Sequence, residues 1–514
     1  MYSFDYAPPR ITDAQIAETY DAEVVIVGAG IAAMVAAVKA SELSDNVHII
    51  EKGASYGSTC CASAACNSRV QREAGMEFDV DEMIGKFWGT SQGYQAELPL
   101  IALWFQRSGE FMDWLTDILA KRGFKTQAFG FLPGFKNPDA FFNSFSLIHL
   151  FGDPNPFEGG NPDWMGALEA EAKDNGAVFH YQHTGCQLVR EDAGHGRVSA
   201  VIAKNAKGEY VRFNASKGVI MGAGDFLQDK EMCQKYCPEV LDIYNDFGNK
   251  NNYGDMHKAA MWIGAAMEEH GTADIFGGQT ITGKNLRPNV PYYSHFMDWS
   301  WGPAYATLPT LFVDIAGRRC MNEEMQFVEA GYAIVTKPGH RIWSVWDEGW
   351  ADKVGGMYPE YTPFSLNNVE QRELDIKEGL TVRADTIDEL IDKMGVDPDI
   401  FKATLERYNA LCDKGHDDDC LKDPHWMVKV DQGPFYASCL GSASEGTRVG
   451  LRIDRNINVL DTEGRPIPGL YAIGNTSGNF YGCVYPCNIA ASGVGHGQCF
   501  GYLAAKHCIT GSTE

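Results

Sequence analysis

Two tyrosines near the C-terminus have the spacing and chemistry of a candidate catalytic pair. The stretch "YGCVYPCNIAASG" covers residues 481–493 and places Tyr481 and Tyr485 four residues apart, with Cys483 and Cys487 beside them. A phenol with a pKa of about 10 is a neutral donor suited to negative charge that develops on a carbonyl oxygen. The alternative is that the tyrosines pack a turn and the cysteines are small buried neighbours. We predict that Tyr485 acts on a substrate carbonyl, with Tyr481 as a second candidate.

A glycine-rich turn near the N-terminus predicts a dinucleotide site. Gly28, Gly30 and Ala33 form a G-x-G-x-x-A pattern between a predicted strand and a predicted helix, and Glu51 ends the following strand. Gly28 allows the tight turn, Gly30 lets the backbone approach a pyrophosphate, and small Ala33 lets the helix pack on the strand. Glu51 can accept hydrogen bonds from ribose hydroxyls. A glycine turn without a ligand is the alternative, but the complete strand, turn and helix context favours a nucleotide.

The residues that follow Glu51 favour FAD over NAD. The stretch "KGASYGSTCCASAACN" over 52–67 is a second run of small residues. Such a run can enclose the same pyrophosphate from the other side, as the longer flavin cofactor requires. A small-residue surface loop is the alternative interpretation of this stretch alone.

The elements that position these residues belong to a large chain. With 514 residues it should hold two domains, because single cores seldom grow beyond ~250 to 300 residues. A net charge of -25 argues against nucleic acid or an anionic membrane as partner. The apolar run over 24–38 is shorter than the ~20 residues that a bilayer span needs. The first 21 residues have no export signal, so we expect a cytoplasmic protein without a membrane span.

The cysteine pattern predicts neither a disulfide framework nor a metal centre. Fourteen cysteines are scattered along the chain, which favours reduced thiols. The sequence has no haem attachment motif and no ferredoxin-like cysteine run. We therefore expect no metal, and a reductase of this kind would need an external electron donor.

The rest of the chain alternates between strand and helix patterns. The N-terminal turn lies between a predicted strand over 23–27 and a helix over 31–43. Residues 254–269 read as an amphipathic helix, and 385–415 as a helical segment with good caps. The acidic stretch "KGHDDDC" over 414–420 predicts a solvated loop. Further strands are predicted in the segments "VFHYQHTGCQLVRED", "KGVIMGAGDF" and "GLYAIGNTSG".

Five stretches in order resemble the family of fumarate reductases, succinate dehydrogenase flavoproteins and 3-ketosteroid dehydrogenases. They are "VVIVGAGIAAMVAA…IIEKG", "YGSTCCASAACN", "KGVIMGAGDF", "LFVDIAGRRCMNEE" and "GLYAIGN". The resemblance implies an α/β fold with a Rossmann-like FAD domain built from both chain ends, 1–270 and 435–514. A capping and substrate domain over 271–434 would interrupt it, with the active site between the two.

The resemblance also implies a set of FAD-binding residues and a noncovalent cofactor. The histidine that anchors FAD in succinate dehydrogenases has no counterpart in "YGSTCCASAACN". We therefore expect one noncovalent FAD per chain. The predicted cofactor-binding residues are Gly28, Gly30, Ala33, Glu51, Lys52, Ser58, Thr59, Ser63, Ala64, Ala223, Gly224, Asp255, Gly474 and Asn475.

The sequence departs from the fumarate reductase branch at its acid and its substrate clamps. Phe327 stands five residues after Asn322, where fumarate reductases place an acid arginine. The His-Thr pair and the carboxylate-binding arginine of that branch are replaced by "SEGTRVGLRID" and "YGCVYPCNI". Burying two carboxylates without paired arginines is costly, so a dicarboxylate substrate is disfavoured.

The ketosteroid dehydrogenase branch is more similar. "EGTRVGLRID" and "GNTSGNFYGCVYP" match its Gly-Thr-x-x-Gly-Leu and Gly-Asn-x-Ser…Gly-x-x-Tyr-Pro segments. Tyr485 falls where that family's tyrosine donates to the substrate ketone. The Gly-x-Gly that follows in the family is replaced by "CNI", and Phe327 replaces its proton-handling tyrosine. Because phenylalanine cannot transfer a proton, either another group supplies the acid or base or the substrate class differs. Tyr481 is our first substitute and Tyr332 a weaker one.

An aromatic segment supplies the expected substrate pocket. Within the segment 290–312, positions 290–305 contain Tyr293 and Trp301 among six aromatic side chains in poorly periodic chain. An aromatic satellite core is one interpretation, and an apolar wall for a flat polycyclic or aromatic substrate is the other. With Phe327, these two residues make up the predicted pocket.

The sequence thus predicts an FAD-dependent oxidoreductase. It would transfer hydride between flavin N5 and the carbon–carbon bond next to a carbonyl in an apolar, enone or ketosteroid-like substrate, in either direction. One alternative is a reductase of a conjugated acid of the fumarate, acrylate or urocanate type. Another is a flavin electron-transfer subunit with no substrate pocket.

Overall fold

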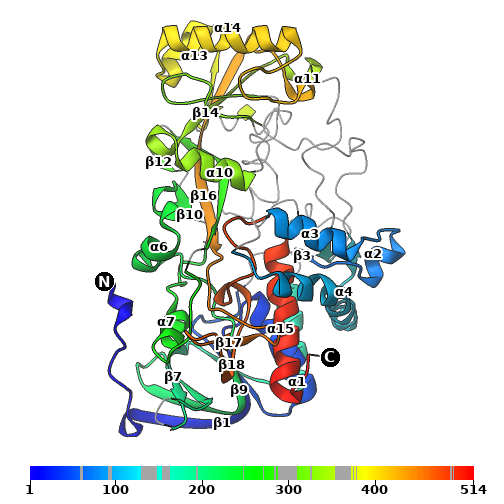
Figure 1. Cartoon of the computed structure of the whole chain (residues 1–514), viewed down its shortest axis with the longest axis vertical. Helices are drawn as coiled ribbons and strands as arrows, with labels where there is room; N and C mark the ends of the chain where they lie inside the picture. The colour runs from blue at the N-terminus through cyan, green and yellow to red at the C-terminus, as the bar shows by residue number, and fades with distance from the viewer. Residues whose placement is uncertain are drawn as a thin grey trace.

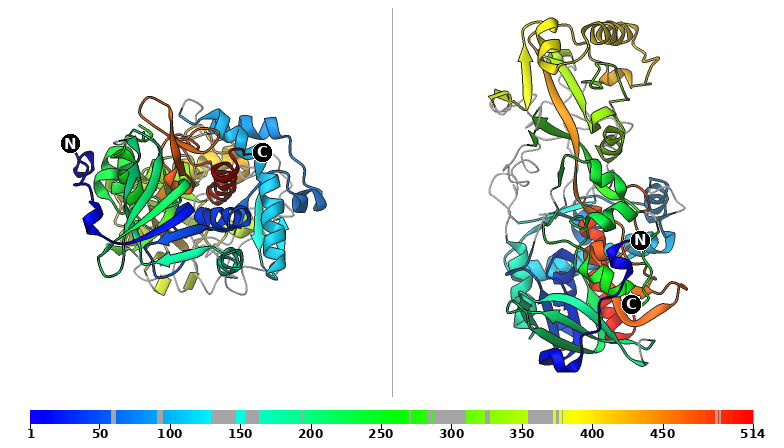
Figure 2. Two further views of the ribbon diagram at one scale, coloured as in Figure 1. Left: turned by 90° about the horizontal axis from the view of Figure 1, so that it is seen from below. Right: turned by 90° about the vertical axis from the view of Figure 1, so that its left-hand side faces the viewer.

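The structure is a computed structural model of the whole chain. It describes residues 1–57, 62–90, 95–128, 147–152, 163–192, 195–246, 248–269, 271–282, 285–286, 310–323, 327–353, 372–373, 376–377, 379–486, 489 and 491–513. Figure 1 shows a lower body that holds both chain ends and an upper body built from the middle of the chain. Figure 2 shows the same elongated arrangement from two other sides.

The lower body is organised by a sheet with a parallel centre. Within the described residues its strand order is β17-β18-β9-β1-β2-β6, and β7 and β8 extend it from β9. The pairs β18–β9, β9–β1, β1–β2 and β2–β6 are all parallel. The strands are β1 (Ile16–Val27), β2 (Val47–Glu51), β6 (Val178–Tyr181), β7 (Thr184–Arg190), β8 (Val198–Lys204), β9 (Tyr210–Met221), β17 (Asn458–Leu460) and β18 (Pro466–Ala472).

This sheet joins the two ends of the chain. Val27 of β1 and Ala472 of β18 are both paired with Met221 of β9. Because parallel strands end at one edge, the turns after these strands lie together. The α/β fold with a nucleotide-type sheet is as the sequence predicts, whereas the boundaries at 270 and 435 stay predictions.

Two helices pack on this sheet through backbone contacts. α1 (Ile31–Leu43) and α15 (Ser492–Thr510) lie side by side in Figure 1. A Cβ added at Gly501 of α15 would stand 2.5 Å from the carbonyl oxygen of Ala32, so only glycine allows this approach. α1 is buried along most of its length, which explains its continuous apolar sequence.

The upper body is built on a second, largely antiparallel sheet. β16 (Phe435–Thr447) is its long central strand and runs down to the lower body in Figure 1. The described order is β12-β11-β16-β14-β13, with β10 and β15 also paired to β16. The other strands are β10 (Asn245–Asp246), β11 (Ala273–Thr282), β12 (Asn285–Leu286), β13 (Leu311–Val313), β14 (Ile342–Asp347) and β15 (Thr381–Ala384).

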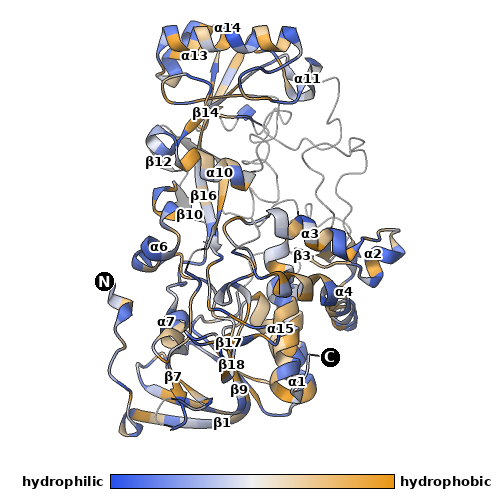
Figure 3. Ribbon diagram, viewed as in Figure 1, coloured by the Kyte–Doolittle hydropathy of each residue, from blue (hydrophilic) through white to orange (hydrophobic). Residues whose placement is uncertain are grey.

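Two helices cover the top of this sheet. α13 (Ile387–Met394) and α14 (Pro398–Lys414) follow the predicted helical segment. Figure 3 shows hydrophobic and hydrophilic residues alternating along α14, as one buried and one exposed face require. The prediction of a solvated loop after α14 is wrong for Asp417. This residue is buried, and its carboxylate accepts hydrogen bonds from Arg319 at 2.7 and 2.9 Å. That ion pair compensates the cost of burying the carboxylate.

Most of the remaining elements surround the lower body and the junction between the two bodies, whereas α11 (Trp350–Lys353) lies near α14 in the upper body (Figure 1). A small sheet has the order β3-β5-β4. Its strands are β3 (Ala62–Ala64), β4 (Thr126–Ala128) and β5 (Ile148–Phe151). The other helices are α2 (Arg69–Glu73), α3 (Val80–Thr90), α4 (Leu98–Lys121), α5 (Trp164–Asp174), α6 (Lys230–Tyr236), α7 (Asp255–Met261) and α10 (Phe327–Val335). Among the described residues, no helix combines the length and apolar character that crossing a membrane requires.

The helix predicted over 254–269 is shorter in the structure. α7 ends at Met261, and Gly264 adopts a left-handed φ of +96° that stops the helical pattern. Ala265 and Met267 then form isolated bridges with Asp461 and Leu451. Ala265 and Met267 are therefore buried by strand-like pairing.

This short extended segment buries the carboxyl group of Glu268. Glu268 accepts a 2.9 Å hydrogen bond from the backbone N–H of Gly450. A Cβ added at Gly478 would lie 2.2 Å from its Oε2, so the carboxyl group contacts bare backbone. Burial raises the pKa of Glu268 to about 8, although backbone hydrogen bonds from Gly450 and Asn479 oppose this shift.

The raised pKa of Glu268 predicts a pH-dependent stability. The protonated carboxyl group is favoured in the folded state, so its contribution is complete below the ordinary value of 4.5 and is lost as pH rises through about 8. Glu268→Gln removes this titration. We expect the melting temperature of the wild type, relative to the variant, to fall between pH 5 and 9. If the melting temperatures of the two proteins change with pH in the same way across this range, the assignment of the raised pKa to Glu268 is contradicted.

The contact between α15 and α1 predicts the effect of one added methyl group. Gly501→Ala should destabilise the fold by about 1 to 3 kcal/mol, because overpacked sites relax only partly. Gly85→Ala in α3 is the matched control, since an added Cβ there meets no described heavy atom within 4 Å. The control should gain about 0.5 to 1 kcal/mol from better helix propensity. Chemical denaturation measures both, and equal effects at the two positions would refute the packing argument.

Candidate active site

The predicted pyrophosphate turn has the geometry that its sequence requires. Gly28 has a φ of +107°, and an added Cβ there would lie 2.2 Å from the carbonyl oxygen of Gly222. Gly30 is the N-cap of α1 without a side-chain cap, and a Cβ added to it meets no described atom within 4 Å. Glu51 accepts hydrogen bonds from the N–H groups of Ala29 at 2.7 Å and Gly53 at 2.6 Å. The carboxylate therefore also holds the turn.

A second group of predicted cofactor residues joins β9 to β18. The hydroxyl of Thr476 accepts from the N–H of Ala223 at 2.9 Å and donates to the carbonyl of Gly224 at 2.9 Å. Thr476 follows Gly474 and Asn475 in a short 3-10 turn after β18. The structure thus brings all four predicted residues of these two segments together at the edge where the parallel strands end.

The predicted residues of β3 lie against the first turns of α15. Ser63 Oγ donates a 2.6 Å hydrogen bond to Gln498 Oε1, and both side chains are buried. An added Cβ at Gly495 would come within 2.0 Å of the Ala64 carbonyl oxygen. Ser63 and Ala64 are therefore next to the helix that follows Tyr485.

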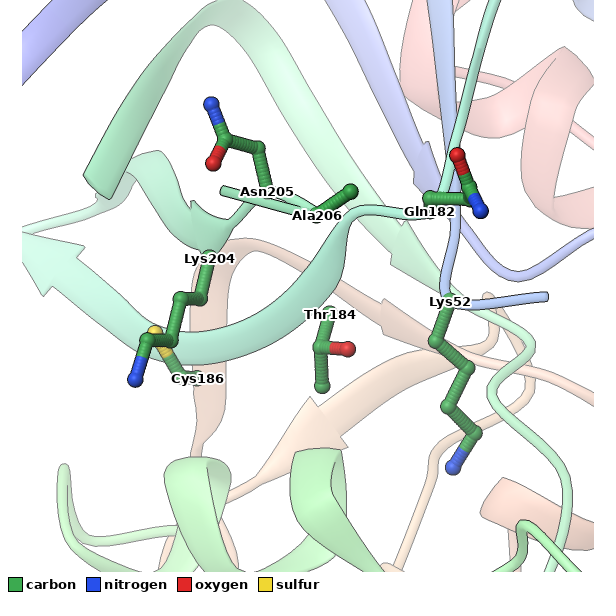
Figure 4. Close-up of a pocket in the computed structure, with 7 residues that line it drawn as sticks. All are labelled: Lys52, Gln182, Thr184, Cys186, Lys204, Asn205 and Ala206. Atoms are coloured by element: carbon green, nitrogen blue, oxygen red, sulfur yellow. The ribbon is translucent and has the colours of Figure 1, made fainter. Parts of the chain in front are cut away.

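A surface pocket lies beside the end of β2 (Figure 4). Its lining residues are Lys52, Gln182, Thr184, Cys186, Lys204, Asn205 and Ala206. Figure 4 shows the Lys52 and Lys204 side chains on either side of Thr184. Lys52 also forms a 3.1 Å ion pair with Asp255, another predicted cofactor residue. Because Lys52 directly follows Glu51, the pocket adjoins the end of β2 where ribose contacts are predicted.

These features fit FAD. The uncapped N-terminus of α1 leaves backbone N–H groups for an anion, and the open space at Gly30 lets a phosphate approach them. The residues that would hold the cofactor come from both chain ends, as the parallel sheet requires. FAD, when bound, supplies the acceptor or donor of a hydride.

Tyr485 lies where α15 begins. Its hydroxyl oxygen accepts a 3.1 Å hydrogen bond from the N–H of Gly493, in the first turn of α15. Tyr485 is 7% exposed, and its ring centroid lies 5.1 Å from that of Tyr481. The two tyrosines singled out by the sequence are therefore neighbours, and Tyr485 is held at a positive helix end.

Tyr481 is the more deeply buried of the two. Its ring lies among Phe87, Phe480 and His496. Burial raises the pKa of Tyr481 well above its ordinary value, and the neighbouring Tyr485 adds to this, whereas Arg448 opposes it. Tyr481 is thus a phenol that stays neutral.

A buried ion pair stands behind these tyrosines. Arg448 follows β16, and its guanidinium carbon lies 5.1 Å from the ring centroid of Tyr485 and 5.8 Å from that of Tyr481. It donates hydrogen bonds to Asp274 of β11 and to the side chain of Asn475. Burial would lower the pKa of Arg448, but Asp274 raises it well above its ordinary value. The pair therefore places a permanent cation next to the candidate catalytic tyrosine.

Aromatic rings and a neutral histidine also pack around Tyr481. The ring of His496 stacks on Phe480 at 4.0 Å between centroids, and its Nε2 has no hydrogen-bond partner among the described residues. Burial lowers the pKa of His496 to about 3. Phe480 in turn contacts Phe87 and Trp104. This cluster is apolar and uncharged at neutral pH.

Several predicted site residues either lie outside the described residues or form hydrogen bonds elsewhere. Ser58, Thr59, Tyr293 and Trp301 lie outside the described residues. Phe327 begins α10, but its side chain also lies outside them. Tyr332, the weaker substitute acid, bonds to Thr272 and to the backbone of Ala273. Its hydroxyl thus holds the start of β11, next to Asp274.

Sequence reasoning missed Arg448, Asp274 and His496. Each has a weak signal in the sequence. Arg448 is the first basic residue after the long small-residue strand "YASCLGSASEGT", and Asp274 is the lone acid in "TADIFGG". His496 interrupts the glycine-rich start of α15. Charged groups in apolar strands need partners, and here the two strands supply them to each other.

Comparison with known proteins connects this site to a family. The family described as "FAD binding domain" matches residues 23–275 and 304–488. The vinyl phenol reductase of Lactiplantibacillus plantarum is 25% identical over 95% of this chain and 96% of its own. The 3-oxosteroid 1-dehydrogenase of Mycobacterium tuberculosis (strain ATCC 25618 / H37Rv) is 30% identical over 59% of this chain and 54% of its own.

The fold has a close counterpart among solved structures. The 3-ketosteroid delta1-dehydrogenase of Sterolibacterium denitrificans superposes with a TM-score of 0.73 at 19% identity, over 96% of this chain and 100% of its own. The resemblance found in the sequence is thereby confirmed for the family and the fold. The chain belongs to the FAD binding domain family, its cofactor is FAD, and it is an oxidoreductase.

Proposed function

We propose that this oxidoreductase acts on the carbon–carbon bond next to a carbonyl, or conjugated with it, in an apolar substrate. An enone or ketosteroid-like molecule is the first candidate, and the direction is reduction or dehydrogenation. The observation that carries the proposal is the Tyr485 hydroxyl, fixed by Gly493 N–H at the start of α15 and flanked by Arg448. The name of the 3-oxosteroid relative supports a carbonyl substrate, and that of the vinyl phenol relative supports a carbon–carbon double bond conjugated with a neutral aromatic ring.

Tyr485 has the role of a hydrogen-bond donor to the substrate oxygen. Negative charge builds on that oxygen when hydride moves to or from the conjugated carbon, and a fixed donor stabilises it most in the transition state. By accepting from Gly493, the phenol oxygen becomes more polarised and its O–H a stronger donor. The helix N-terminus adds positive potential around the same oxygen, and Arg448, paired with Asp274, lies beside the ring.

The surrounding side chains keep water away from the reacting atoms. Phe480, Phe87 and Trp104 are buried behind Tyr481. In such an environment each electrostatic interaction is stronger than in water. Tyr481 is the candidate for handling the one proton that accompanies the hydride, and its neutral state suits the donor role in the reducing direction.

Two other functions remain alternatives. A conjugated acid would need a cationic clamp, and Arg448 is the residue that could provide it. A flavin electron-transfer subunit would have no substrate pocket of its own. A panel of enones, saturated ketones and conjugated acids, added anaerobically to oxidised and reduced holoenzyme, separates these functions through the flavin absorbance. Absence of any spectral response to the whole panel would favour the electron-transfer alternative.

Tyr485→Phe tests the assigned donor. The substitution keeps the ring and removes the hydroxyl, so turnover should fall about a hundred- to a thousand-fold, the usual cost of ~2.7 to 4 kcal/mol for one such donor. FAD content should change little. Tyr502→Phe is the control, because Tyr502 is equally buried on α15 but donates to Glu110 at 3.0 Å, away from the site. If Tyr485→Phe keeps half of wild-type turnover when chemistry limits the rate, the tyrosine only packs.

The attachment of FAD is a separate prediction. Residues 52–67 contain no histidine that could anchor the cofactor. Acid precipitation of the yellow holoenzyme should therefore leave all FAD in the supernatant. Flavin absorbance retained by the precipitated and washed polypeptide would disprove noncovalent binding.

A further inference from the structure

We propose that Asp274 makes the site selective for neutral substrates, because its carboxylate already balances the charge of Arg448. This inference rests on the proposed function and adds a specificity determinant to it. It assigns the site to ketones and other uncharged conjugated compounds, and excludes conjugated carboxylates.

The ion pair is built into the junction of the two sheets. β11 and β16 are antiparallel, and Ala273 is paired with Thr447. Because the pairing is antiparallel, Arg448, just after β16, lies opposite Thr272, and Asp274 is its diagonal neighbour across the two strands. The backbone N–H of Arg448 also donates to the carbonyl of Thr272 at 2.9 Å. The contact is therefore fixed by the backbone ladder and does not depend on a flexible loop.

Both charged groups are removed from solvent. The Asp274 side chain is 0% exposed and that of Arg448 is 11% exposed. Asp274 Oδ1 and Arg448 Nε have no hydrogen-bond partner among the described residues. Solvent thus screens the pair weakly, and each charge acts strongly on its surroundings. A buried arginine cannot lose its proton, so its charge has to be balanced by a neighbour.

The other described groups around the pair supply no further positive charge. His496 is neutral because burial lowers its pKa to about 3. The two tyrosines contribute neutral rings. Asp225 lies beside Asn475, the second partner of Arg448, and burial raises its pKa to about 6. At neutral pH the described site therefore carries no surplus cation for an incoming anion.

A neutral substrate and a carboxylate differ in the cost of entering this site. The neutral carbonyl brings no charge into the buried region, and it gains a hydrogen bond from the Tyr485 hydroxyl as its oxygen becomes negative. A carboxylate would arrive with its charge unmatched, next to the existing carboxylate of Asp274. Removing charge from water without a partner is costly, so binding is disfavoured before any reaction occurs.

Asp274→Asn should reverse this preference. The amide keeps the size of the side chain and an oxygen that can accept from Arg448, but it leaves the guanidinium charge unbalanced. The test measures dissociation constants from the perturbation of oxidised flavin absorbance in holoenzyme. It uses two pairs of probes with matched shapes: 4-phenyl-3-buten-2-one with cinnamate, and 3-penten-2-one with crotonate. Flavin content and circular dichroism check that each variant is folded.

The expected result is a change in the ratio of the two affinities. Wild type should bind each ketone more tightly than its matched acid. Asp274→Asn should shift the ratio toward the acid by at least about tenfold. The double variant Asp274→Asn with Arg448→Met should lose that gain. Asp417→Asn, which removes a buried carboxylate from Arg319 in the upper body, should leave the ratio unchanged.

Three results would overturn the inference. Equal binding of ketone and acid by the wild type would do so even if Asp274→Asn failed to fold. An unchanged ratio in folded Asp274→Asn would also do so, and the proposed function would survive because the ketone still binds. A wild type that responds to no neutral enone would reject the proposed function, and the inference with it.

Discussion

The pairing of β9 with both β1 and β18 is the constraint on which the rest of the structure depends. It aligns Val27, Met221 and Ala472 at one end of the parallel sheet, although these residues are far apart in sequence. The turns after all three strands therefore meet at the edge where parallel sheets bind nucleotides. One strand register thus brings the N-terminal and C-terminal parts of the predicted FAD site together.

Close contacts at glycines bring the residues of the site together. An added Cβ at Gly28 would lie 2.2 Å from Gly222 O, and one at Gly222 would lie 2.9 Å from the Cβ of Ala33. The same closeness recurs where Gly501 of α15 meets α1. Because backbone touches backbone at these points, α15 is held close to the sheet, and its first turn can hold Tyr485. The glycines thus serve both the predicted cofactor site and the placement of Tyr485.

The sequence predicts the FAD-binding part of the site well, because the sequence signals for that part are local. The strand, turn and helix around Gly28 and the capped helices α13 and α14 are fixed by residues close in the chain. The Arg448–Asp274 pair could not be predicted, since it depends on the register of two strands 174 residues apart. The helix after Gly254 was predicted too long because an apolar segment was interpreted by its period alone. Asp417 was placed in solvent because its partner Arg319 is 98 residues away.

The ion pair behind Tyr485 also bears on how the site distinguishes ground state from transition state. A lone buried cation would stabilise any anion, whether it is a substrate, a product or a reacting species, and uniform binding of this kind does not speed the chemical step. A cation balanced by Asp274 offers little to a bound neutral molecule. When charge grows on the substrate oxygen in the proposed reaction, however, the Gly493-held phenol would already be in place to donate to it, so no reorganisation would be needed at that moment. In the proposed reaction, balancing the charge beforehand would therefore leave the electrostatic stabilisation to the phenol, which acts mainly on the transition state.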